Sequence, residues 1–398
     1  MVASTYPYNL SRNIIQLHLT CIWMTLIERM LRPSSACRYG FRLFSSAVKY
    51  SAVGDPQKVL QIEAQDALGK INADEVHIKF LASPINPSDI NMVQGSYGVA
   101  AKLPAVGGNE GVAVVTEVGS SVRTLAVGDW VIPFRTGFGC WRNEAVTSEG
   151  ELIKVANDIP AAYAATLSVN PATAYRLLRD FENLKPGDVI IQNGANSMVG
   201  LAVIQIAKSM GIKTINIIRS DRPRAKQLLE LLSNLGGDVN VVNEQVNTPA
   251  FRESISKFPP CRLAFNCIGG SATTEMIRCL GTGSTVVTYG GMSKRPLTVP
   301  VDLLTYRQLN LRGFWMAAWY EERGPEEKAK MMEDIVEMIR SKQLSFFYDL
   351  HDFKDFHKAL GKSFEPFGIQ KIILDFGATP QMIDKGTKSD EIYRTYLI

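Results

Sequence analysis

Two segments of the sequence carry residue types suited to chemistry. Gln94–Gly98 (QGSYG) places Tyr97, whose phenol can donate a proton, between glycines. About ninety residues later, Val189–Gly200 (VIIQNGANSMVG) reads as an apolar strand that runs into a turn of small residues and then a helix. Such a turn can hold the phosphates of a nucleotide. The two segments together indicate a dinucleotide site and a candidate proton donor.

The turn follows the dinucleotide-binding fingerprint only in part. The fingerprint places small residues where the backbone meets the pyrophosphate, and a third glycine where the helix packs closely on the strand. These places fall on Ala195, Ser197 and Gly200, so only the third is glycine. The preceding strand and following helix favour a phosphate site at the helix N-terminus. Without that order, the same residues indicate a plain strand-turn-helix.

The end of the next predicted strand bears on the choice of dinucleotide. An NAD site has an acidic residue there, which bonds the ribose 2′-hydroxyl. This chain has Ile218-Arg219-Ser220, and an arginine can pair with a 2′-phosphate. We therefore expect NADP(H). Asp221 is the contrary residue, and we interpret it as a partner of an arginine or as a helix N-cap.

The sequence offers no recognisable zinc site. Catalytic zinc takes three or four nitrogen, sulfur or oxygen ligands from the protein and solvent. The segment Gly108-Asn109-Glu110 has asparagine where zinc alcohol dehydrogenases have histidine, and Asn86–Asp89 holds no cysteine. The chain has four histidines, and its six cysteines form no C-x-x-C pair. We expect no metal, and we interpret the cysteines as reduced packing residues.

Metal-free hydride chemistry needs a hydrogen-bond donor near the charge that develops. Hydride addition to C3 of an enoyl thioester places negative charge on the carbonyl oxygen and on C2. Tyr97 is the natural donor, although a loop tyrosine that merely packs its ring explains the same spacing. Trp141 and Trp315 are candidates for lining an acyl pocket, with a position in the core as the alternative.

The first part of the chain is rich in predicted strands. Val76–Ala82 alternates apolar and polar residues, and Gly111–Gly119 and Asp129–Pro133 are further apolar segments between turns. Short strands with frequent turns favour a partly open barrel over a parallel sheet. We expect one domain of this kind.

From Asn170 the pattern changes to alternating strands and helices, which predicts an α/β fold with a doubly wound parallel sheet. The expected elements are a helix with Ala174, Leu177, Leu178 and Phe181 on one face, strands Val189–Gln192, Thr214–Ile218, Val239–Val242, Leu263–Cys267 and Ser284–Tyr289, and helices Val199–Met210, Arg224–Leu235 and Ser271–Leu280.

The end of the chain is predicted to return to the first domain, through a helix over Glu326–Arg340 and a strand over Lys371–Leu374. The parallel sheet is then an insertion beside a cleft. We expect a catalytic domain over 46–171 and 314–375, a nucleotide-binding domain over 172–313, and a disordered tail over 376–398.

The N-terminal segment resembles an organelle transit peptide. Residues 1–45 carry the whole net charge of +4 and hold arginine and serine with one acidic residue. Arg42–Ser45 is typical of a mitochondrial processing site, and Met30 is an alternative start; a disordered cytosolic arm is the competing interpretation. The apolar run Ile14–Leu26 is too short to span a bilayer, and the uncharged body has no general attraction for nucleic acid or anionic membrane.

Six segments in order, between about Val48 and Leu374, resemble the mitochondrial trans-2-enoyl-thioester reductases, a zinc-free, quinone oxidoreductase-like branch of the medium-chain dehydrogenase/reductase superfamily. The six segments are Gln94–Gly98, Leu103–Gly111, Gly128–Pro133, Val169–Pro171, Tyr289–Met292 and Leu311–Trp315. The resemblance implies a GroES-like barrel, a Rossmann domain and a homodimer. It further implies NADPH-dependent reduction of acyl-carrier-protein or CoA thioesters in mitochondrial fatty-acid synthesis, in the matrix.

The resemblance also implies roles for single residues. Tyr97 is the proton donor, and the NADPH contacts are Asn170, Asn196, Ser197, Met198, Val199, Arg219, Ser220, Asp221, Tyr289, Gly290, Gly291, Met292, Phe314, Trp315, Met316 and Lys371. The chain departs from the family at Met198, where glycine is usual, by one extra residue near Ser220, and in its tail after Phe376. A quinone reductase of the same superfamily and a catalytically silent NADPH-binding regulatory protein are the alternatives.

Overall fold

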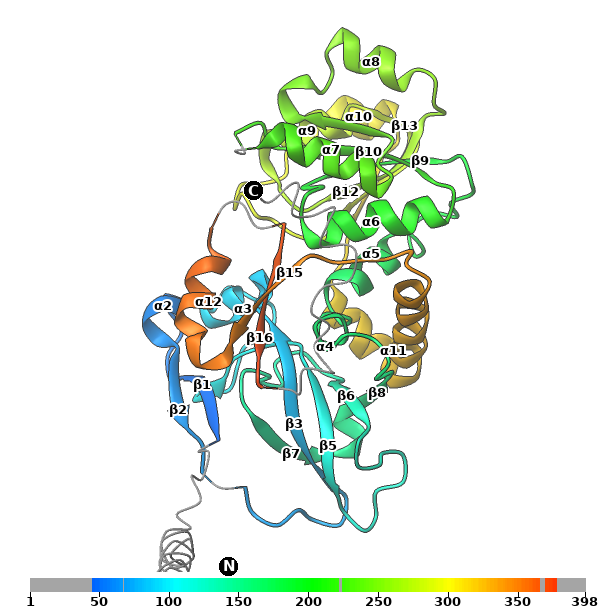
Figure 1. The fold of residues 1–398 in the computed structure, drawn as a ribbon. Coiled ribbons are helices and arrows are strands. Elements are labelled where there is room, and N and C mark those ends of the chain that lie inside the picture. The colour runs from blue at the N-terminus through cyan, green and yellow to red at the C-terminus, as the bar shows by residue number, and fades with distance from the viewer. Residues whose placement is uncertain (1–44, 67, 222–223, 366–368, 378–398) are drawn as a thin grey trace, which may run out of the picture. The chain divides into compact units, whose positions relative to one another are not determined.

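The computed structural model describes residues 45–66, 68–221, 224–365 and 369–377 (Figure 1). The predicted transit peptide, apart from Ser45, and the tail from residue 378 lie outside these residues. Within them, no helix is both long and apolar enough to cross a membrane.

One sheet is parallel and has six strands in the order β11-β10-β9-β12-β13-β14 (Figure 1). The chain therefore winds outward twice from β9, as in nucleotide-binding sheets, and the predicted doubly wound sheet is confirmed. The strands are β9 (Val189–Asn193), β10 (Lys213–Ile218), β11 (Val239–Val242), β12 (Cys261–Asn266), β13 (Leu280–Thr288) and β14 (Asn310–Gly313).

The helices of this region connect the strands of the parallel sheet. Three of them match predicted helices to within a few residues: α6 (Met198–Ser209), α7 (Ala225–Leu235) and α9 (Gly270–Ile277). The predicted helix near Asn170 is α5 (Asn170–Leu177), which ends before Phe181. Two short helices were not predicted, α8 (Pro249–Ile255) and α10 (Val301–Tyr306).

A second sheet is mostly antiparallel and has seven strands, in the order β15-β16-β3-β5-β6-β8 with β7 also paired to β3. Because β3 pairs with β16, β5 and β7 along its length, the sheet curls around it, as the partly open barrel requires. The strands are β3 (Glu75–Pro84), β5 (Val112–Val118), β6 (Trp130–Pro133), β7 (Glu144–Ser148), β8 (Leu152–Val155), β15 (Tyr348–Asp352) and β16 (Lys371–Asp375).

The predicted return of the chain to this sheet is seen in the pairing of β16 with β3, which places Ile373 opposite Pro84. Smaller elements surround the sheet. A three-stranded sheet has the order β2-β1-β4, and the short helices α2 to α4 and α12 complete the fold. These elements are β1 (Ser46–Tyr50), β2 (Gln61–Ala64), β4 (Ala105–Val106), α2 (Pro56–Val59), α3 (Pro87–Val93), α4 (Ala161–Ala164) and α12 (Phe356–Ser363).

The element α11 (Met316–Arg340) consists of two helices that meet at a kink, and the second of them is the predicted helix Glu326–Arg340. The helix is broken at Gly324, which has φ 80° and ψ −179°, directly before Pro325. A residue before proline is excluded from helical geometry, and proline has no N–H for the previous turn. Glycine adopts this positive φ at little cost. The sequence pattern therefore revealed only the half after the break.

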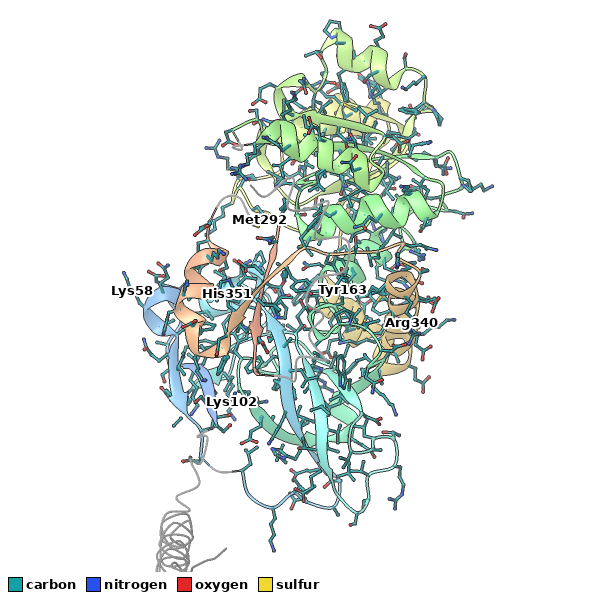
Figure 2. All side chains as sticks on the ribbon, in the orientation of Figure 1. Lys58, Lys102, Tyr163, Met292, Arg340 and His351 are labelled. Carbon is teal, nitrogen blue, oxygen red and sulfur yellow. The ribbon has the colours of Figure 1, made fainter. Side chains whose placement is uncertain are left out.

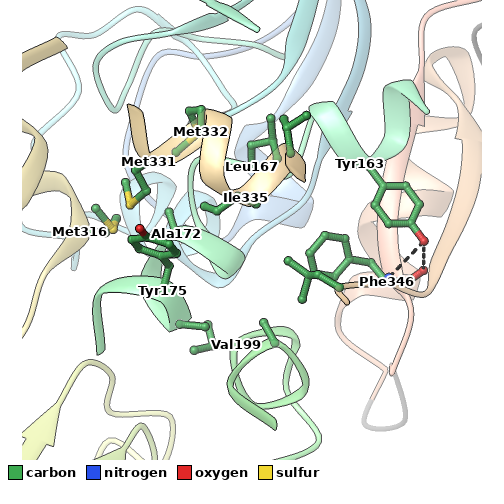
Figure 3. Close-up of a cluster of buried hydrophobic side chains, with 14 of the residues drawn as sticks. Tyr163, Leu167, Ala172, Tyr175, Val199, Met316, Met331, Met332, Ile335 and Phe346 are labelled. Carbon is green, nitrogen blue, oxygen red and sulfur yellow. Dashed lines mark hydrogen bonds between the residues drawn. The ribbon is translucent and has the colours of Figure 1, made fainter. Parts of the chain in front are cut away.

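The largest hydrophobic core joins α5 and α6 to α11 (Figure 3). It includes Met331, Met332 and Ile335 from α11 and Val199 from α6. At its margin the Tyr163 hydroxyl donates to the Phe346 carbonyl at 3.3 Å and accepts from the Phe346 N–H at 3.2 Å, so its polar end is satisfied. This core ties the helices of the parallel sheet to α11.

Two expectations for aromatic residues are corrected by the packing. Trp141 is fully buried, packs on Phe356 with ring centroids 5.0 Å apart, and donates its N–H to the Pro84 carbonyl. It is a core residue, so its proposed place in an acyl pocket was wrong. Phe376, which the prediction placed in the tail, packs on Phe80 and Phe353.

Candidate functional site

Tyr97 follows α3 and lies against Trp315, which caps the N-terminus of α11. The indole N–H of Trp315 donates to the Tyr97 oxygen at 2.9 Å, and the rings meet edge to face with centroids 5.7 Å apart. A Cβ on Gly98 would lie 2.7 Å from the indole, so glycine lets the tryptophan approach this loop. The contact brings together two residues 218 positions apart in the chain.

The Tyr97 hydroxyl is set up as a donor. Its oxygen accepts from Trp315, and no acceptor for its own hydrogen lies among the described residues. Burial raises the pKa of Tyr97, the Trp315 hydrogen bond lowers it, and the Asp89 carboxylate raises it. Because the net direction is upward from 10.0, the phenol stays protonated at neutral pH.

The predicted phosphate turn connects β9 to α6. The Ser197 hydroxyl caps α6 by accepting from the Gly200 N–H at 3.1 Å. A Cβ on Gly200 would lie 2.6 Å from the Ala195 carbonyl oxygen, which explains why glycine is required at the third position. The N–H groups of Met198 and Val199 open the helix and have no partner within it, so they are available to an anion.

Met198 stands where the family usually has glycine, and its partly buried side chain packs against the largest hydrophobic core. Val199 is also buried in that core, so the turn offers backbone groups rather than these two side chains.

The end of β10 presents polar side chains to solvent. Arg219 lies 3.5 Å from the Asp221 carboxylate, so Asp221 is an arginine partner as predicted; the N-cap of α7 is Arg224, and the N-cap alternative was wrong. The Ser220 hydroxyl donates to Glu244 at 2.6 Å. Glu244 was missed by the sequence reasoning, because it follows β11 rather than β10.

Asn170, the first residue of α5, carries a buried acceptor without a donor. Its side chain is 8% exposed, and its Oδ1 has no hydrogen-bond partner within the described residues. A buried acceptor left unpaired typically costs about 1–3 kcal/mol. The position fits a ligand that brings an N–H or O–H donor.

The remaining predicted cofactor residues follow β13 and β14. Tyr289 is partly buried, and its covered hydroxyl has no hydrogen-bond partner among the described residues. Removal of the hydroxyl from water, then the Cys267 thiol, raise the pKa of Tyr289 well above 10.0. Gly291 is exposed, as is Met292, which Figure 2 labels, whereas Met316 belongs to the hydrophobic core. Phe314 packs edge to face on Phe181 at 5.7 Å.

Four of the predicted segments meet at one edge of the parallel sheet, because each follows the carboxyl end of a parallel strand. They are Asn196–Val199 after β9, Arg219–Asp221 after β10, Tyr289–Met292 after β13 and Phe314–Met316 after β14.

Lys371 lies elsewhere, in a group that we call the buried polar cluster: Asn86, Asp89, Glu110 and Lys371. The Lys371 ammonium donates to the Asn86 Oδ1, and the Asn86 Nδ2 donates to Glu110 at 2.7 Å. Asp89 accepts from the backbone N–H groups of Asn86 and Asn109 at 2.7 and 2.8 Å. Burial raises the pKa of Asp89 to about 6 and that of Glu110 to about 7, and it lowers the pKa of Lys371.

No group of three or more histidine, cysteine, aspartate or glutamate side chains among the described residues could hold a metal ion. Asn109, where zinc alcohol dehydrogenases have histidine, accepts a backbone hydrogen bond from Gly137 at 3.0 Å.

Comparisons with known proteins agree with this geometry. Residues 72–169 match the alcohol dehydrogenase GroES-like domain family, and residues 199–337 match the zinc-binding dehydrogenase family. A curated relative, the mitochondrial enoyl-[acyl-carrier-protein] reductase of Rattus norvegicus, is 50% identical over 82% of this chain and 88% of its own length. The chain belongs to the mitochondrial enoyl-[acyl-carrier-protein] reductase family.

Solved structures of related reductases share the fold. The mitochondrial 2-enoyl thioester reductase Etr1p/Etr2p heterodimer from Candida tropicalis is 31% identical, with a TM-score of 0.77 over 84% of this chain and 100% of that chain. Etr1p has also been solved with NADP and crotonyl-CoA, at the same identity, TM-score and coverage. The resemblance read from the six sequence segments is thus confirmed at the level of the family.

The sequence pattern did not reveal the role of the two acidic members of the buried polar cluster, Asp89 and Glu110. Asn109 and Glu110 served only to argue against zinc, and Asp89 only as part of a segment without cysteine. A signal was present, because two acidic residues lie in otherwise apolar or small-residue surroundings (Asp89 and Glu110), and buried carboxylates need partners.

Proposed function

We propose that the protein reduces trans-2-enoyl thioesters with NADPH in mitochondria, and that Tyr97 supplies the proton to C2. The proposal rests on one observation. The Tyr97 oxygen accepts a hydrogen bond from the Trp315 N–H, so the phenol O–H is available to donate. The family membership supports the reaction class, since the named relatives are enoyl-[acyl-carrier-protein] reductases and a relative has been solved with crotonyl-CoA.

The residues of this chain fit a dinucleotide. The N-terminus of α6 offers N–H groups to a pyrophosphate, and Gly200 allows the helix to approach the strand that leads to it. Arg219 is half-exposed and, among the described residues, forms an ion pair only with Asp221, so its guanidinium can turn to a 2′-phosphate. The unpartnered Asn170 Oδ1 fits an amide or hydroxyl donor of the same ligand.

Bound NADPH supplies the hydride for C3 of the substrate. The protein's part is to hold the thioester so that C2 faces the phenol, and to keep that phenol protonated. Trp315 fixes the direction of the Tyr97 hydroxyl, because the oxygen must present its lone pair to the indole N–H. The phenol O–H then quenches the negative charge on C2, which is general acid catalysis.

The proposal extends to the carrier of the acyl group and to the assembly of the protein. The relatives' names include the acyl carrier protein, and Etr1p was solved with crotonyl-CoA, so we propose both carriers as substrates. We further propose a homodimer through β14, which pairs only with β13 in the described chain and is exposed along its length. The neighbouring α10 exposes Tyr306 to 80%. Leu311→Asp should convert dimer to monomer in sedimentation, because it charges this edge.

The reaction is tested by following NADPH oxidation in the purified protein with crotonyl-CoA and, separately, with a quinone. We expect NADPH-dependent formation of butyryl-CoA and little turnover of the quinone. NADPH oxidation with the quinone alone would assign the protein to a quinone reductase. Tight NADPH binding without turnover of either substrate would indicate a regulatory protein.

A further inference from the structure

The amide of Asn86 stands between the buried ammonium of Lys371 and the carboxylate of Glu110. Its oxygen accepts from Lys371, and its nitrogen donates to Glu110 at 2.7 Å. The Lys371 ammonium forms no salt bridge with any described carboxylate, although its side chain is only 5% exposed. The neutral Asn86 amide thus links Glu110 to Lys371 by two hydrogen bonds.

This arrangement leaves the ammonium incompletely satisfied. An ammonium has three N–H donors, and the described residues accept one of them. A direct ion pair with a carboxylate would occupy more of them and cancel the charge. The hydrogen bond to the neutral Asn86 amide instead leaves two N–H donors and most of the positive charge of Lys371 available to a ligand.

Lys371 is faced by acidic groups from two other elements. The Glu110 carboxylate, and then Asp89, raise the pKa of Lys371 against the effect of burial. Glu110 also interacts with Lys328 and Tyr320 of α11 and with Cys140, while Asp89 interacts with Tyr50 and Tyr97. Glu110 is therefore the group that most directly keeps Lys371 charged.

We propose that Asn86 and Glu110 are positioning residues for dinucleotide binding, which hold the Lys371 ammonium in place and charged without neutralising it in an ion pair. The inference rests on the proposed function and on the NADPH contact that the resemblance implies for Lys371. It goes beyond that function because it assigns a role to two residues that do not themselves touch the cofactor.

The test is the pH dependence of NADPH affinity, measured by calorimetric titration of the native protein and of Glu110→Gln. Without the Glu110 charge, Lys371 loses its proton at lower pH. The two proteins should therefore bind NADPH with similar affinity at acidic pH, and the variant should bind several-fold more weakly at alkaline pH. A loss that is the same at every pH contradicts the proposal.

A double-mutant cycle separates positioning from general damage. Glu110→Gln should have little further effect in a Lys371→Met background, because its influence acts through the ammonium. If Glu110→Gln does not fold, Asn86→Ala is tested in its place. The hydrogen bond from Asn86 to Asp89 is donated by the backbone N–H, so it survives this substitution. Asn86→Ala should likewise weaken NADPH binding in the native background and have little effect in Lys371→Met.

The cycle also distinguishes this inference from the proposed function. Additive effects of the two substitutions overturn the positioning role. Unchanged NADPH affinity in Lys371→Met, with crotonyl-CoA reduction intact, overturns the inference but leaves the reductase standing. Failure of the native protein to bind NADPH at all overturns the proposed function itself.

Discussion

The phosphate turn and the buried polar cluster are built in opposite ways. The turn is continuous in sequence, from β9 to α6, and it presents backbone N–H groups. The cluster is assembled from α3, the loop before β5 and β16, and the hydrogen bond from Lys371 to Asn86 joins residues 285 positions apart. A site made of contiguous backbone leaves a pattern in the sequence, whereas a site made of distant side chains leaves only isolated polar residues.

The two regions should also respond differently to mutation. The turn should be sensitive to any added atom, because its glycine lies against backbone that cannot move away. The cluster should be sensitive to charge and to pH, because burial has shifted the pKa of each ionisable member.

The largest effect on folding stability is expected for Gly200→Ala. The added Cβ would lie 2.6 Å from the Ala195 carbonyl oxygen, so α6 must shift away from β9. We expect a loss of ~1–3 kcal/mol in unfolding free energy and NADPH affinity weakened by about tenfold or more. Gly361→Ala, within α12 and with no atom near its Cβ, is the matched control and should stabilise by ~0.5–1 kcal/mol. Urea unfolding and NADPH titration measure both; similar results for the two variants would show that the turn is not tightly packed.

Arg219→Glu tests the contribution of a side chain beside the phosphate turn, because it leaves the backbone of the turn unaltered. Loss of a charge-assisted contact of ~1.5–3 kcal/mol lowers NADPH affinity by roughly ten- to more than hundred-fold. NADH affinity should change little, because NADH lacks the 2′-phosphate. Comparison of the two dissociation constants checks this. Equal use of both cofactors by the native protein would mean that Arg219 does not select NADPH.

Lys328 tests whether the surroundings of the buried polar cluster respond to pH. It is buried in α11 and donates to the carbonyls of Pro133 and Phe134, and burial lowers its pKa to about 7. Between this value and the ordinary 10.5, the unfolded chain binds more protons, so this group makes the folded state more stable as pH rises.

Lys328→Met should remove that gain. Relative to the variant, the native protein should become more stable by ~2 kcal/mol between about pH 7 and about pH 9. The exposed Lys330→Met is the control, and its difference from the native protein should stay constant. Chemical unfolding at each pH gives the answer, and parallel curves for native and Lys328→Met would refute the shifted pKa.

The smallest effect is expected for Glu244→Gln. The Glu244 carboxylate accepts from Ser220 in the predicted 2′-phosphate region, so it places negative charge near a phosphate. Because the pair is exposed, the repulsion is screened, and NADPH affinity should rise only about two- to fivefold at low salt. The gain should disappear at high salt. Weaker NADPH binding in the variant would show instead that Glu244 orders the loop for the cofactor.

The parallel sheet was predicted well, because β9, α6 and β10 combine apolar runs with turn residues of clear meaning. β14 was missed because all four of its residues are exposed, so Asn310–Gly313 shows neither alternation nor an apolar run. The first half of α11 was missed because it is a separate helical segment, which ends at Gly324 and Pro325 before the predicted segment begins.

The candidate site shows the same limit. Tyr97 and the turn could be found from their glycine-rich surroundings, but the hydrogen bond from Trp315 could not, since it depends on how two distant loops meet. Asn86, Asp89 and Glu110 escaped notice for the same reason. Their significance is their burial beside Lys371, which no local pattern predicts.

The central claim is that the Tyr97 hydroxyl delivers the proton, and Tyr97→Phe tests it most directly. The substitution keeps the ring against Trp315 and removes the hydroxyl, and with it both the proton donor and the acceptor of the Trp315 N–H. We predict unchanged folding and NADPH affinity, with kcat for crotonyl-CoA lowered by ~10²–10⁴-fold and KM changed much less. Turnover of crotonyl-CoA by Tyr97→Phe at close to the native rate would contradict the account.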